Sequence, residues 1–97
     1  MSFNTVKSIP KEYIDLSYNR TLPVIASFNV RGDCVPVYFR YTFADGTYTD
    51  IAIDRVSIMD KRFRQTIYEC IITANDIRQK VTLTYFREDG LWVLKTN

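Results

Sequence analysis

The acidic residues that are spaced closely enough to be considered as a catalytic or cation-binding group are Asp45, Asp50 and Asp54. Carboxylates that meet in pairs can act as general acid and base, or bind a hard cation. Two simpler roles compete with that chemistry. Aspartate in a turn bonds to its own backbone, and aspartate on an outer strand face pairs with a basic residue across the ladder. We interpret these residues as a solvated strand face and assign no catalytic, cofactor-binding or metal-binding residue.

The two cysteines, Cys34 and Cys70, are the other candidate reactive groups. A reactive thiol needs its pKa lowered by a basic neighbour or a helix N-terminus. Cys70 falls on a predicted core face, where cysteine behaves as a small apolar residue. Cys34 lies beside a predicted turn, with Arg31 across from it, and is the more exposed of the two. Their number does not build a disulfide framework, and we expect both to be structural.

The chain contains no histidine, which removes the commonest general base and metal ligand. Its 3 glycines all lie at predicted turns. No glycine-rich phosphate loop is therefore formed. We predict a protein that is not an enzyme and has no cofactor.

A group of basic residues is the candidate nucleic-acid surface. It gathers around one predicted hairpin and the adjoining strand, and consists of Arg55, Lys61, Arg62, Arg64, Arg78 and Lys80. With Tyr48 and Phe63 nearby, the cations would bind phosphates and the rings would stack on bases. The competing interpretation is a solvated hairpin whose charges prevent aggregation. The net charge of only +2 favours this second interpretation.

The elements that must position all these residues are β-hairpins. Turn dipeptides separate runs rich in Val, Ile, Thr, Tyr and Phe: Gly32-Asp33, Asp45-Gly46, Asp60-Lys61, Asn75-Asp76 and Asp89-Gly90. This spacing is typical of consecutive hairpins. The sequence offers no amphipathic helix to cover the resulting sheet, so the sheet must close on itself. We predict an all-β antiparallel meander of six or seven strands closed into a small barrel, with a two-sheet sandwich as the alternative.

Side-chain alternation predicts the register of each hairpin, because a slip of one residue inverts every side chain. A two-residue loop at 32–33 places Phe28 opposite Val37 on the apolar face. The expected core follows from the same alternation and contains Phe28, Val37, Phe39, Ile53, Tyr68, Cys70, Val81 and Leu83.

The second turn needs a three-residue loop at 44–46. This loop pairs Phe39 with Ile51 on the inner face and Arg40 with Asp50 on the outer face. It also gives Gly46 a left-handed backbone, which glycine adopts at little cost.

In the run 47–58 that follows, the alternation of apolar residues changes from odd positions (Ile51, Ile53) to even positions (Val56, Ile58). A β-bulge near Asp54-Arg55 would let Ile53 and Val56 both face inward. A loop at 60–62 then pairs Val56 with Thr66. The turn at 75–76 is predicted to pair Cys70 with Val81.

The last turn, at 89–90, is predicted to pair Tyr85 with Leu94.

The outer face of the predicted sheet carries a candidate interface. Its members are Ile67, Ile71 and Phe86 on neighbouring strands, with Ile25 and Tyr38 on another stretch. Apolar patches of this kind mark interaction sites. The alternative is that the N-terminal segment covers the patch through Tyr13, Ile14 and Leu16.

With 97 residues the chain is long enough for one domain. We predict a flexible N-terminal arm over 1–10 and a single β-barrel domain over 11–97, with 11–20 forming either a strand or a helical turn.

The N-terminus lacks a secretory signal pattern, so we expect a cytoplasmic protein. The expected function is a binding or assembly module whose partner is another protein or a second copy. Nucleic acid is the alternative partner, and no membrane partner is expected, because no apolar run approaches the ~18 residues of a transmembrane helix.

Overall fold

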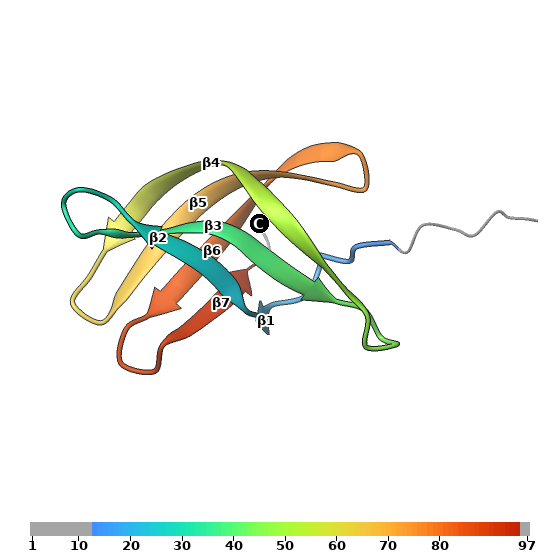
Figure 1. Ribbon diagram of the computed structural model, residues 1–97, viewed down its shortest axis with the longest axis horizontal. Helices are drawn as coiled ribbons and strands as arrows, with labels where there is room; N and C mark the ends of the chain where they lie inside the picture. Colours follow the sequence, from blue (N-terminus) through green and yellow to red (C-terminus); the bar gives the residue numbers. More distant parts are fainter. Residues whose placement is uncertain (1–12, 96–97) are drawn as a thin grey trace, which may run out of the picture.

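The computed structural model describes residues 13–95. Within them the chain forms seven strands and no helix (Figure 1): β1 (Arg20–Thr21), β2 (Val24–Phe28), β3 (Cys34–Thr42), β4 (Tyr48–Lys61), β5 (Gln65–Ala74), β6 (Ile77–Phe86) and β7 (Leu91–Lys95). The predicted all-β meander is confirmed, and it has seven strands. The expected arm over 1–10 lies outside the described residues. The described segment 13–19 forms neither a strand nor a helical turn.

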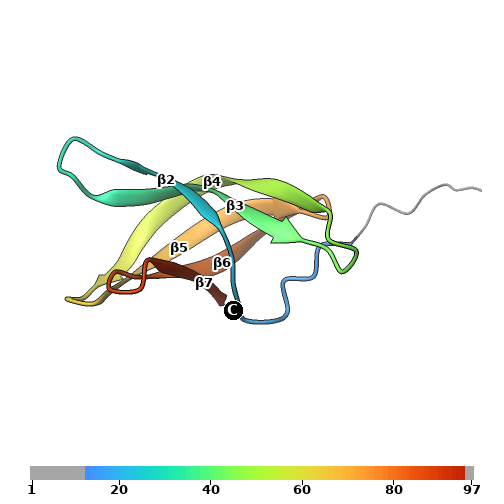
Figure 2. The ribbon, with the colours of Figure 1, turned by 60° about the horizontal axis from the view of Figure 1, so that its bottom comes forward.

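The strands make one antiparallel sheet in the order β1-β7-β6-β5-β4-β3-β2. The sheet curls strongly into a half-barrel (Figures 1 and 2). Its two edges are joined by the chain itself, because β1 leads into β2 through Leu22 and Pro23. The Leu22 N–H donates to the Trp92 carbonyl on β7 (3.1 Å), and the Arg40 N–H on β3 donates to the Pro23 carbonyl (2.9 Å).

The core lies on the concave face of the half-barrel. Its buried apolar residues come from the strands and the β1–β2 link: Leu22, Phe39, Tyr41, Ile51, Tyr68, Cys70, Ile72, Ala74, Val81, Leu83, Trp92 and Leu94. Most of the predicted core is therefore confirmed. Val37 and Ile53 are half-buried, and Phe28 is exposed.

The segment 13–19 packs on the same concave side. Ile14 and Leu16 contact the core. The Ile14 N–H donates to Asn75 Oδ1 (2.9 Å), and Asn75 Nδ2 donates to the Ile14 carbonyl (2.8 Å). The alternative that this segment covers the outer apolar patch is therefore wrong for residues 13–19.

The loop at 44–46 has the predicted geometry. Phe39 pairs with Ile51, and Arg40 pairs with Asp50. The two charged side chains also form an ion pair of 2.9 Å. Gly46 has a φ of 90°, as a left-handed turn position requires.

The turn at 75–76 is also confirmed, with Cys70 opposite Val81. Asn75 and Asp76 have φ values of 55° and 62°. Left-handed values at both central positions define the type I′ turn that fits the twist of a hairpin.

The β-bulge in β4 is confirmed, because the ladder shifts register between Ile53 and Arg55. Ile53 and Val56 both pack against the core despite their different parity. The pairing partner is wrong, since Val56 lies opposite Cys70 and not Thr66. A further register shift lies between Ile58 and Asp60, which the alternation did not reveal, and β4 continues to Lys61, within the loop expected at 60–62.

The register predicted at 32–33 is wrong. Phe28 pairs with Cys34 and not with Val37, and the ladder shifts again between Ile25 and Ala26. The loop is longer than two residues because Asn29 closes it. The Asn29 side-chain oxygen accepts the N–H groups of Arg31 (2.9 Å) and Asp33 (3.0 Å), which is a common role for asparagine in turns.

The last register is wrong by two residues. Tyr85 pairs with Trp92, and Leu94 pairs with Leu83. The loop spans 87–90, with the Gly90 N–H donating to the Phe86 carbonyl (2.9 Å). A shift of two residues keeps each side chain on its face, so Trp92 and Leu94 remain in the core.

Candidate functional site

The two ends of the half-barrel differ. The β3–β4 and β5–β6 turns lie at one end, where segment 13–19 packs against the core. The β2–β3, β4–β5 and β6–β7 turns gather at the other end (Figure 1). A cavity of about 300 Å³ opens here between the turns and the concave face. We call it the three-turn cavity.

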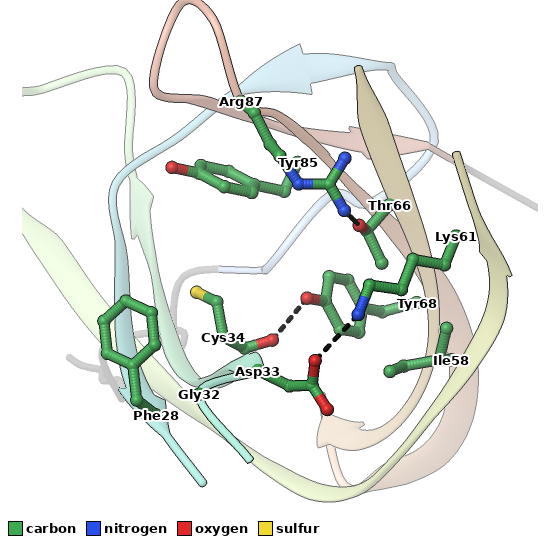
Figure 3. A pocket seen from close by; sticks show the side chains of 10 residues that line it. All are labelled: Phe28, Gly32, Asp33, Cys34, Ile58, Lys61, Thr66, Tyr68, Tyr85 and Arg87. Atoms are coloured by element: carbon green, nitrogen blue, oxygen red, sulfur yellow. Dashed lines mark hydrogen bonds and ion pairs between the residues drawn. The ribbon is translucent and has the colours of Figure 1, made fainter. Parts of the chain in front are cut away.

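Apolar side chains form part of the wall of the three-turn cavity (Figure 3). Phe28 at the end of β2 and Ile58 on β4 line it, together with the ring of Tyr85 on β6. Phe28 is 74% exposed because it lies beyond the packed part of the core. The Tyr85 ring stacks on Trp92, with 4.6 Å between ring centroids.

Arg87 supplies an unbalanced positive charge to the cavity. Its Nη1 donates to the carbonyls of Arg62 (2.5 Å) and Phe63 (3.0 Å), and its Nη2 donates to the Thr66 hydroxyl. All three acceptors are neutral. Among residues 13–95, no carboxylate lies within ion-pair distance of this half-buried guanidinium.

The other polar groups of the cavity already have partners. Lys61 Nζ lies 2.7 Å from Asp33 Oδ1, and this hydrogen bond holds the pKa of Asp33 below its usual value. The Tyr68 hydroxyl donates to the Cys34 carbonyl (Figure 3). Burial raises the pKa of Tyr68 to about 12, so Tyr68 is a neutral donor.

Both cysteines are free thiols. Burial raises the pKa of Cys34, and the charge of Arg87 opposes this rise only in part. Burial also raises the pKa of Cys70 to about 12. Neither thiol is ionised near neutral pH, and the thiolate is the nucleophile.

The three aspartates that the sequence singled out have separate local roles. Asp45 Oδ1 accepts from the Thr47 N–H (2.9 Å) and hydroxyl (2.6 Å), which lowers the pKa of Asp45. Asp50 is paired with Arg40, and Asp54 accepts from the Thr73 hydroxyl (3.1 Å). Within residues 13–95, no cluster of three acidic or thiol groups is placed to hold a metal ion.

The structure does not bring the basic group onto one face. Most of its members form ion pairs with acidic residues, namely Lys61–Asp33, Arg62–Asp60, Arg64–Glu88 and Lys80–Glu69. Lys61 lines the concave cavity, whereas Arg55 lies opposite the convex residue Ile71, and Arg78 is exposed opposite Thr73. These pairs reduce the charge that is left for phosphate groups.

The aromatic residues expected beside this group are also separated. The Arg40 guanidinium lies over the ring of Tyr48, 3.7 Å from its centroid. Phe63 is exposed at the β4–β5 turn. The structure therefore offers one exposed ring at the basic hairpin.

The candidate interface splits into two parts. Ile67 and Ile71 are half-buried on the convex face of β5. In the ladder Ile67 lies opposite Thr84, which lies opposite Val93, while Phe86 lies opposite Leu91. We define the convex patch as the apolar residues of this face on β5–β7: Ile67, Ile71, Phe86, Leu91 and Val93.

The second part of the interface lies elsewhere on the sheet. Ile25 and Tyr38 are ladder partners on β2 and β3, and β4 separates them from the convex patch. Sequence reasoning missed Leu91 and Val93, although the alternation in β7 was a usable signal: even the wrong last register places both on the outer face.

No protein-family model, curated protein or solved structure matches this chain. Residues 13–95 contain no helix that is long and apolar enough to cross a membrane. What the protein binds must therefore follow from its own surfaces.

Proposed function

We propose that this protein is a non-enzymatic binding and assembly module that self-associates through the convex patch. The observation that carries the proposal is the gathering of apolar side chains on one face of three adjacent strands, β5, β6 and β7. Phe86 and Leu91 are direct ladder partners, and Ile67 and Val93 lie on either side of the buried Thr84. An apolar surface of this kind is typical of an interaction site.

The surroundings of the convex patch support an interface with a second copy. Lys80 on β6 and Glu69 on β5 form an ion pair (3.4 Å) beside Ile71. Because these charges neutralise each other within one chain, they do not repel an identical face. An apolar centre with a polar rim is the usual anatomy of a protein interface, and a symmetric dimer joins the same patch on both copies.

The groups that would carry catalysis support a non-enzymatic role. The pKa values of the Cys34 and Cys70 thiols are raised, and each candidate aspartate is engaged in a local bond. The free thiols also fit a reducing compartment. We propose a cytoplasmic location on this basis.

Sedimentation velocity tests the self-association directly. We expect a dimer at roughly 100 μM, where a standard-size interface is populated. The double variant Ile67→Lys with Ile71→Lys should stay folded and become monomeric. The matched control is Ile25→Lys with Tyr38→Lys, which places the same two charges on residues that are 57% and 41% exposed and away from the patch. A wild-type protein that stays monomeric at this concentration would contradict the proposal.

The alternative function is nucleic-acid binding by the basic hairpin. Retention on an RNA or DNA column, with steep loss as salt is added, would favour it. We rank it second because most of the basic group is ion-paired.

A further inference from the structure

We propose that the three-turn cavity is a binding site for a small organic monocarboxylate, with Arg87 pairing the carboxylate group. The cavity lies on the concave face, so this proposal does not depend on self-association through the convex patch.

The three-turn cavity contains a positive charge, on Arg87, that an anion could balance. Lys61 is balanced by Asp33, whereas Arg87 has only neutral acceptors among residues 13–95. A half-buried cation without a counter-ion is poorly compensated, because a partly apolar surrounding penalises an isolated charge. An anion that enters the cavity would supply the missing charge.

The remaining donors of Arg87 suit a carboxylate. A guanidinium has five N–H donors. Three are used by Arg62, Phe63 and Thr66, which leaves five minus three, or two. Carboxylates accept two parallel N–H bonds from arginine. One uncompensated cation matches a single negative charge better than a phosphate monoester, which carries about −1.5 to −2 near pH 7.

The walls and the size of the cavity define the rest of the ligand. The Tyr85 ring lies beside the guanidinium, and Phe28 and Ile58 add apolar lining farther from it (Figure 3). The volume of about 300 Å³ lies at the lower end of ligand pockets, and it equals roughly ten water molecules' share of the liquid. A single ring or a short branched chain that bears one carboxylate matches this space.

The protein carries its own reporter of binding. Trp92 is the single tryptophan of the chain. It stacks on the cavity residue Tyr85, and its ring centroid lies 5.5 Å from that of Tyr68, which also lines the cavity. A ligand that displaces water beside these tyrosines should change the fluorescence of Trp92.

The test is a fluorescence titration with 3-phenylpropanoate and its neutral counterpart 3-phenylpropanamide. We expect the acid to bind about tenfold more tightly than the amide, because only the acid completes a charged hydrogen-bonded pair. Arg87→Gln should abolish the preference for the acid. Arg64→Gln is the matched control, since Arg64 is an exposed arginine near the same end, pairs with Glu88 and does not line the cavity.

A second variant keeps the test decisive if Arg87→Gln fails to fold. Phe28→Ala removes an exposed wall residue and should weaken acid and amide alike, while the preference for the acid persists. Equal affinity of the wild type for both compounds would overturn the role of Arg87. No response to either compound at about 10 mM, where even weak millimolar sites fill, would overturn the site itself.

Discussion

At the residue scale, Phe39 is the anchor of the core. Its side chain is 0% exposed and sits on β3 opposite Ile51. We expect Phe39→Ala to lower the free energy of unfolding by about 3–5 kcal/mol, because it leaves a large cavity in packed surroundings. Urea denaturation measures the loss. Phe28→Ala is the matched control and should cost less than about 1 kcal/mol, since that ring is mostly exposed. Similar losses in both variants would contradict the position of the core.

Cys70 shows how burial controls reactivity in this fold. The pKa of its thiol is raised to about 12, mainly by burial and also by the neighbouring charge of Glu69. A raised thiol pKa leaves almost no thiolate at about pH 8, and the thiolate is the reacting species. We expect Cys70 in a Cys34→Ser variant to resist a thiol reagent such as DTNB while the protein is folded, and to react rapidly in denaturant. Fast reaction of the folded variant would show that β5 does not bury this residue.

At the element scale, Asp76 carries a conformational cost in the β5–β6 turn. Its φ of 62° is left-handed, and a residue with a Cβ atom pays for that conformation. We expect Asp76→Gly to stabilise the protein by up to about 1 kcal/mol, as judged by thermal and urea unfolding. The control is Asp89→Gly, because Asp89 has no left-handed φ. Asp89→Gly should give no gain, and equal gains at both positions would contradict the assigned turn type.

The turns also explain how far the sequence predicts this structure. The loop at 44–46 and the turn at 75–76 were predicted correctly, because glycine or the Asn-Asp pair sets the backbone locally. The loops at 29–33, 62–64 and 87–90 were not. They depend on the side chain of Asn29, on bulges, or on a four-residue loop that a dipeptide does not reveal.

These three loops all lie at the end of the half-barrel that holds the three-turn cavity. The cavity could therefore not be predicted from the sequence, although Arg87 and Phe28 are visible in it. Arg87 and Phe28 come together only when the registers of the β2–β3, β4–β5 and β6–β7 hairpins are all correct. The sequence-based prediction of each of these three registers was wrong. The convex patch was predicted in part, because Ile67, Ile71 and Phe86 lie on β5 and β6, whose register the sequence predicted correctly.

At the scale of the whole molecule, the chain links the two edges of the half-barrel. A single short segment connects β7 and β3 through Leu22 and Pro23, and segment 13–19 packs against the core near Asn75. The opposite end stays open as the three-turn cavity. The molecule therefore presents two distinct surfaces, a concave cavity with a cation and a convex apolar patch.

The most direct test of self-association is a dilution series of amide ¹H–¹⁵N spectra from about 500 to about 10 μM, which brackets a micromolar dissociation constant. We expect the resonances of Ile67, Phe86 and Val93 to shift with concentration, while those of Ile25 and Val30 stay fixed. Spectra that do not change over this range, or shifts confined to the β2–β3 hairpin, would contradict the central claim that the convex patch joins two copies of the chain.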